Sequence, residues 1–198
     1  MQINSLNDFN TYRDKNPEAM SFLSWSYIDY MSARCCIIYG GLYLSGCVLG
    51  AQAIEKVLKS TLLFHDSKTD VKRFKHKLSK IASELDTKYQ YQILKNYGNI
   101  LNEFEKHYNT KYPYETNSIT AKSNEDLDKL DDIYFNLLEK MKIPEEVRYF
   151  TNIYGNIFNP SYKSSSEHKI ITSGNKTLQL EYPVMEMKYQ ENIKKLKK

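Results

Sequence analysis

The sequence predicts an all-α protein, an antiparallel bundle of four to six helices, with a short β-hairpin as a candidate near the C-terminus. Apolar residues recur every three or four positions through most of the first 160 residues, which is the period of amphipathic helices. The composition, 41% hydrophobic and 26% charged, is typical of a soluble globular domain. We expect one helical domain over residues 1–159 and a C-terminal extension over residues 160–198.

The first long helix is expected to begin at Asn16-Pro17-Glu18, which offers a cap, a proline in the first turn and an acidic residue close to the positive end of the helix. It should run for about 22 residues and end at Gly40-Gly41. Its predicted core face has helical spacing and comprises Phe22, Trp25, Ile28, Ser32, Cys35 and Tyr39.

The second helix, over residues 42–64, is expected to be central, because its first half is apolar almost all round. The main apolar stripe comprises Cys47, Ala51, Ile54, Leu58 and Leu62. Gly46 and Gly50 each cost a helix interior on the order of 1 kcal/mol relative to alanine. We therefore expect both glycines to mark a close approach by a neighbouring helix.

A membrane-spanning helix is the alternative for this region, since residues 35–54 carry no charge and contain the Gly46-x-x-x-Gly50 spacing of membrane helix pairs. Gly40-Gly41 interrupts this run, however, and the apolar stripe continues past Ile54 into a charged segment. These features favour a soluble hairpin of two antiparallel helices and no membrane partner.

Further helices are predicted from the same periodicity and from capping signals such as Ser123-x-x-Asp126 and Pro144-Glu145-Glu146. A Ser-Gly-Asn-Lys turn between alternating residues makes 169–181 the hairpin candidate. The expected order is helix 71–85, helix 89–108, a loop 109–123, a helix from 123 to about 143, helix 144–159, a linker 161–168, the hairpin, and a lysine-rich helix 185–198.

The charge and the cysteines limit the classes of partner. The net charge of +4 equals the surplus of lysines in the last eleven residues, so the body is neutral overall and any anionic partner must meet a local patch. Cys35, Cys36 and Cys47 lie in apolar helical context with no histidine nearby in the sequence, so we expect buried reduced thiols and no metal or other cofactor. The N-terminus lacks the pattern of a signal peptide, which predicts a cytoplasmic protein.

Several of these motifs, taken in order, resemble the HEPN domain family, the higher eukaryote and prokaryote nucleotide-binding helical bundle. They are Trp25 on the first long helix, the turn at Gly40-Gly41, the stretch Ala51-Gln52-Ala53-Ile54-Glu55-Lys56-Val57-Leu58-Lys59, then His76-Lys77-Leu78-x-x-Ile81 and Lys111-Tyr112-Pro113. The similarity extends over about residues 20–115 and is strongest at residues 51–59.

The resemblance implies a bundle that forms a homodimer, in bacterial toxin-antitoxin, phage-defence or RNA-processing systems. Active members of that family are metal-independent endoribonucleases with an Arg-x(4–6)-His motif. In this chain the histidine in the matching helix is His107, and Asn102 stands five residues before it where the family has arginine. Without a guanidinium there is no fixed fork to hold a phosphate. We therefore expect a non-catalytic or degenerate member that binds RNA, a nucleotide or a protein partner.

Two alternatives remain open, a ribonuclease with an altered Asn102/His107 site and a purely structural dimerisation module. A further candidate is a basic patch that could contact the nucleic-acid backbone, or could simply be the solvated face of an amphipathic helix. It comprises Lys72, Arg73, Lys75, His76, Lys77 and Lys80.

Overall fold

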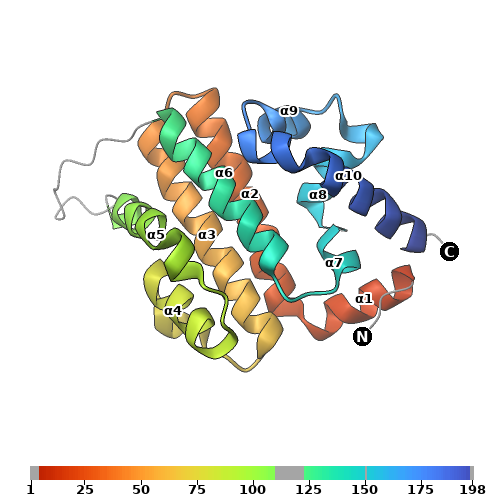
Figure 1. The fold of residues 1–198 in the computed structure, drawn as a ribbon, viewed down its shortest axis with the longest axis horizontal. Helices are drawn as coiled ribbons and strands as arrows, with labels where there is room; N and C mark the ends of the chain where they lie inside the picture. Colours follow the sequence, from red (N-terminus) through yellow and green to blue (C-terminus); the bar gives the residue numbers. More distant parts are fainter. Residues whose placement is uncertain (1–4, 110–122, 150, 197–198) are drawn as a thin grey trace.

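The computed structural model describes residues 5–109, 123–149 and 151–196, and all regular structure in this part of the chain is helical. It contains ten α-helices and two short 3₁₀ helices, with no strand among these residues. In Figure 1, α7 to α10 gather on one side of the long helices α2, α3, α5 and α6. The all-α prediction is confirmed. The predicted loop 109–123 and the motif Lys111-Tyr112-Pro113 lie largely or wholly outside the described residues.

Two long helices, α2 (Pro17–Ile38) and α3 (Tyr43–His65), form the predicted antiparallel hairpin. Gly41, with φ +62°, makes the turn between them. A Cβ at Gly46 would overlap Cγ1 of Ile37 and lie 2.9 Å from the carbonyl oxygen of Ala33. Gly46 therefore allows the two helices to approach closely, as predicted.

Helix α3 is the centre of the fold and packs against α2, α4 (Leu78–Tyr89), α5 (Ile93–Asn109) and α6 (Ser123–Lys140). At Gly50 a Cβ would lie 3.0 Å from side-chain atoms of both Phe104 on α5 and Leu130 on α6. Gly50 thus provides the second close approach on α3. Helix α6 begins at Ser123, the first residue of the predicted capping box, although the side chain of Ser123 is outside the described part.

The prediction for the core face of α2 is wrong. Trp25 and Tyr39 are 55% and 59% exposed, and Ile28 and Cys35 are exposed as well. The buried face is a second apolar stripe on the opposite side of the helix, which comprises Ala19, Leu23, Tyr30, Ala33 and Ile37. Because α2 is apolar on two opposite sides, periodicity alone could not decide which side faces the core.

The predicted helix 71–85 is interrupted, which corrects a second expectation. Val71–Phe74 forms a 3₁₀ helix, and α4 begins only at Leu78. Lys75 between them has φ +50°, a left-handed value that no helix interior can contain. The carbonyl of Lys75 accepts a hydrogen bond from Nζ of the buried Lys59 (2.9 Å), which holds this turn against α3.

The predicted helix 144–159 is also divided, into α7 (Glu145–Tyr149) and α8 (Asn152–Phe158). Phe150, between these two helices, is outside the described residues. Thr151 has an extended backbone, with φ −70° and ψ 158°, and this conformation starts a new helix.

The C-terminal hairpin prediction is wrong, because residues 166–172 and 176–196 are helical. After the 3₁₀ helix Pro160–Tyr162 come α9 (Ser166–Thr172) and α10 (Lys176–Leu196), where a linker, a hairpin and a shorter helix were expected. Gly174, with φ +64°, makes the turn, and the side chain of Asn175 accepts a hydrogen bond from the amide of Leu178 (2.9 Å). The predicted turn at Gly174 is therefore present, but it joins two helices and not two strands.

A fully buried polar cluster attaches this C-terminal segment to the bundle. The guanidinium of Arg34 on α2 pairs with Asp131 on α6 and donates to the carbonyls of Ile170 and Ser173. The hydroxyl of Tyr30 donates to Asp131 over 2.7 Å. Apolar residues of α9 and α10 belong to the same core cluster as those of α3. The division at residue 160 into two parts stays a prediction.

The N-terminal residues form one short helix, α1 (Leu6–Lys15), whose Phe9 is buried. Among the described helices, none combines the length and apolar character that a membrane crossing requires.

Candidate functional site

The two residues predicted for acid–base chemistry, Asn102 and His107, do not form a site together. They are five residues apart on α5, which turns their side chains about 140° from one another. Asn102 is exposed, whereas His107 is buried, with only 4% of its surface accessible. Burial lowers the pKa of His107, with Asp126 and Glu103 acting in the opposite direction.

His107 instead faces two side chains from other helices. Its Nε2 lies 3.9 Å from Oδ2 of Asp126 on α6, and the thiol of Cys47 on α3 donates to the same oxygen over 3.8 Å. Burial, followed by the charge of Asp126, raises the pKa of Cys47 to about 12, so this thiol is not a nucleophile at neutral pH. Sequence reasoning missed this group because its members come from three distant segments with no motif spacing.

The six residues of the basic patch are all exposed, as a contact surface would require. Three of them already have acidic partners. Arg73 pairs with Glu84 (2.6 Å), His76 with Glu55 (2.9 Å) and Lys77 with Glu105 (3.3 Å).

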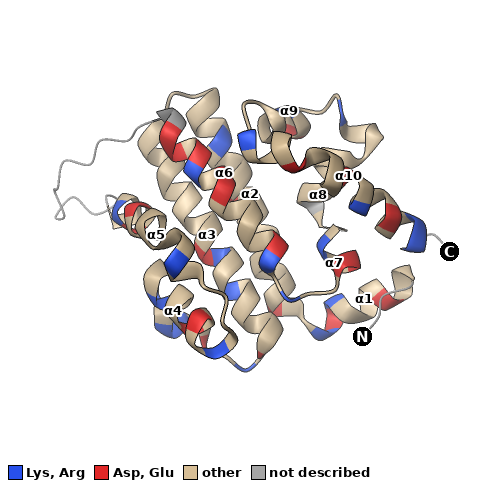
Figure 2. Cartoon of the chain, viewed as in Figure 1, with Lys and Arg blue, Asp and Glu red and all other residues tan. Residues whose placement is uncertain are grey.

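Lys72, Lys75 and Lys80 have no carboxylate within ion-pair distance in the described part of the chain. Figure 2 shows that residues of both signs are interspersed over the helices. The patch therefore offers three uncompensated charges and no broad positive field.

A polar network fixes the shape of this basic segment. The carboxylate of Glu55, itself buried, accepts hydrogen bonds from Lys59 (2.6 Å) and pairs with Nδ1 of His76 (2.9 Å). The imidazole of His76 also stacks on Tyr108 of α5, with ring centroids 4.4 Å apart. His76 therefore helps to position this segment. The sequence had instead predicted that His76 faces solvent or contacts phosphate.

The outer face of α2, defined here as Trp25, Ile28, Ser32, Cys35 and Tyr39, exposes large apolar side chains to solvent, among them Trp25, Ile28 and Tyr39. It continues into the turn and the start of α3, where further apolar side chains are exposed: Leu42, Tyr43 and Leu44. Contiguous exposed apolar surface of this kind marks interaction sites.

Two charged residues beside this face, Lys56 and Asp29, compensate each other. Lys56 of α3 pairs with Asp29 on α2, and its ammonium lies 5.9 Å from the centre of the Trp25 ring. Such an arrangement removes an unpaired charge from the rim of the face. The expectation that all cysteines are buried holds for Cys47, whereas Cys35 is exposed on this face.

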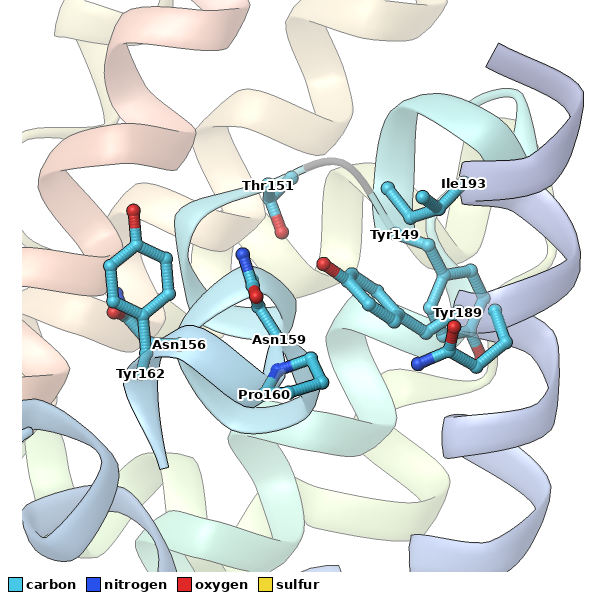
Figure 3. Close-up of a pocket in the computed structure, with 10 residues that line it drawn as sticks. Tyr149, Thr151, Asn156, Asn159, Pro160, Tyr162, Tyr189 and Ile193 are labelled. Atoms are coloured by element: carbon cyan, nitrogen blue, oxygen red, sulfur yellow. The ribbon is translucent and has the colours of Figure 1, made fainter. Parts of the chain in front are cut away.

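A groove of about 600 Å³ opens between α8, the 3₁₀ helix Pro160–Tyr162 and α10. Figure 3 shows polar side chains of Thr151, Asn159 and Tyr189 directed toward its middle. None of its described lining residues is Asp, Glu, His, Lys, Arg or Cys. The groove therefore has the character of a binding site for a small uncharged group.

Comparison of the chain with protein-family models, with curated proteins and with solved structures gives no significant match. The HEPN resemblance therefore stays a prediction.

Proposed function

We propose that this protein is a non-catalytic, HEPN-like helical bundle that acts by binding, and that its first binding partner is a second copy of the same chain. The observation that carries the proposal is the outer face of α2. Its two largest side chains, Trp25 and Tyr39, expose more than half of their surface to solvent. Burying such a face against a like face removes apolar area from water on both copies.

The arrangement along α2 suits a twofold antiparallel pairing. Ser32 lies midway between Trp25 and Tyr39, seven residues from each. If the twofold axis passes near Ser32, Trp25 of one copy meets Tyr39 of the other, and Ile28 lies opposite Cys36. The small side chain of Ser32 then allows the helices to approach at the centre. Asp29 beside this face is paired with Lys56, so it brings no unpaired charge to the contact.

Self-association can be measured through the only tryptophan of the chain, Trp25. Dilution of the wild type should shift Trp25 emission to longer wavelength as the dimer dissociates, and sedimentation should give twice the monomer mass at high concentration. Ile28→Glu should yield a monomer, because a carboxylate would be buried in an apolar interface.

Leu180→Glu is the matched control, since Leu180 is an 81% exposed apolar residue on another helix, α10. It should remain dimeric. A wild-type monomer at every concentration, or equal loss of the dimer in both variants, would remove the proposal.

A second candidate function is backbone contact with single-stranded RNA through Lys72, Lys75 and Lys80, which have no acidic partner among the described residues. Three phosphate contacts would give weak, sequence-independent binding that falls steeply with salt. A fluorescein-labelled oligouridylate in fluorescence anisotropy tests this. Replacing the three lysines by glutamine should abolish binding, whereas Lys15→Gln, an exposed lysine on α1, should not.

The ribonuclease alternative has less support, because His107 is buried and separated from Asn102. Cleavage of single-stranded RNA that survives EDTA and disappears in His107→Ala would establish that alternative. A toxin-antitoxin or defence setting, with a protein partner, stays an expectation of the family resemblance.

A further inference from the structure

Three side chains with metal-binding atoms meet where α3 begins, α5 ends and α6 begins. Cys47 is in the second turn of α3, His107 is two residues from the end of α5, and Asp126 is in the first turn of α6. Their exposed fractions are 1%, 4% and 6%. One sulfur, one ring nitrogen and one carboxylate oxygen of these residues all lie within 4.8 Å of one another.

We propose that Cys47, His107 and Asp126 bind Zn²⁺. Thiolate, imidazole and carboxylate are the three side-chain groups that zinc takes as ligands in proteins. With zinc–ligand bonds of about 2.0–2.3 Å, tetrahedral geometry places two donors about 3.4–3.6 Å apart. The distances from Oδ2 of Asp126 to Sγ of Cys47 and to Nε2 of His107 are 3.8 Å and 3.9 Å. The donors of Cys47 and His107 lie within 4.8 Å of each other, so binding would bring these two about 1 Å closer together and would shorten the other two distances by a few tenths of an ångström.

The packing one turn further into the bundle holds the three helices at the spacing this site needs. Gly50 lies three residues after Cys47, Phe104 three before His107, and Leu130 four after Asp126. A Cβ at Gly50 would lie 3.0 Å from both Phe104 and Leu130, so the missing side chain allows α5 and α6 to approach α3 together. The same residues that close the core therefore position the three donors.

Binding would exchange a proton for the metal. The Cys47 thiol loses its proton to solvent as the sulfur–zinc bond forms, while His107 binds through a neutral ring nitrogen and Asp126 through its carboxylate. The described residues supply three of the four donors that zinc usually takes. Because the three ligands are buried and come from three helices, the role of the ion would be to cross-link the end of the bundle.

The test uses full-length protein that has been reduced and stripped of metal with a chelator. Addition of Co²⁺ should produce the thiolate-to-cobalt charge-transfer band with one equivalent per chain, and Zn²⁺ should displace it. Cys47→Ser should remove the band. His107→Gln and Asp126→Asn should each weaken Zn²⁺ binding more than about 100-fold, the upper end of what the loss of an outer-shell partner costs. Competition with a chromophoric chelator measures the affinity.

The controls are Cys35→Ser and Cys36→Ser, which change the adjacent cysteines of α2 and should retain the band. Zn²⁺ should raise the melting temperature of the wild type and of the controls and leave that of Cys47→Ser unchanged. The melting transition of Cys47→Ser shows at the same time that this variant is folded. Absence of the band in the wild type, or its loss in the Cys35 or Cys36 variant and not in Cys47→Ser, would overturn the proposal.

Discussion

Gly46→Ala should destabilise the protein, although alanine is the better helix former. A Cβ at this position would overlap the side chain of Ile37 and lie 2.9 Å from the backbone oxygen of Ala33. A backbone atom cannot rotate away as a side chain can, so α2 and α3 must separate locally. This change would disturb the most extensive helix–helix contact among the described elements, between α2 and α3.

The magnitude follows from two opposing terms. Alanine in a helix interior gains about 1 kcal/mol over glycine. Overpacking a tight contact costs about 1–3 kcal/mol, and the upper end applies here because the obstacle includes backbone. We therefore expect a net loss of about 2 kcal/mol in the free energy of unfolding.

Gly98→Ala is the matched control. Gly98 is also in a helix interior, on α5, but no atom lies within 4 Å of a Cβ built there. This variant should be stabilised by about 0.5–1 kcal/mol, so the two variants should differ by about 3 kcal/mol. Urea unfolding followed by circular dichroism measures both. If Gly46→Ala is as stable as Gly98→Ala, the close approach of α2 and α3 is refuted.

Three further predictions concern the polar contacts of the fold. Arg34→Leu should cost about 3–5 kcal/mol in urea unfolding, since it leaves the carboxylate of Asp131 buried without its cation, and adding Asp131→Leu should recover much of the loss. Lowering the pH from about 6.5 to 5 should reduce the free energy of unfolding of the wild type more than that of His65→Gln. Burial, with a contribution from Lys142, lowers the pKa of His65, so the unfolded state binds more protons in this range and stability falls as pH falls. Asp86→Ala should cost about 1–2 kcal/mol, because its carboxylate accepts from the first two amides of α5 (2.6 and 2.8 Å), and guanidinium unfolding can measure it. Unchanged stability of Arg34→Leu or of Asp86→Ala would contradict the contact that each removes. An equal loss of stability with falling pH in the wild type and in His65→Gln would contradict the prediction for His65.

The sequence was sufficient for those features that depend on neighbouring residues. Asn16-Pro17-Glu18 marked the start of α2, Gly40-Gly41 marked its end, and the dense apolar period of residues 42–64 identified the central helix. Gly46 and Gly50 could be recognised as close contacts because a glycine in a helix interior has a known cost that packing must offset. The exposure of the basic patch also followed from its position off the apolar stripe.

Tertiary structure decided the features that depend on which surfaces meet. Helix α2 has two apolar sides, and only the positions of α3 and α6 determine that Tyr30 is buried and Trp25 exposed. The turn at Gly174 fits two strands or two helices equally well by local chemistry, and burial of Ile171 and Leu178 against the bundle favours helices. His107 lies 60 residues after Cys47 along the chain, and Asp126 lies 79 residues after it. No local pattern could therefore bring the three together. Local sequence fixes backbone conformation within a few residues, whereas burial and proximity are set by the packing of whole helices.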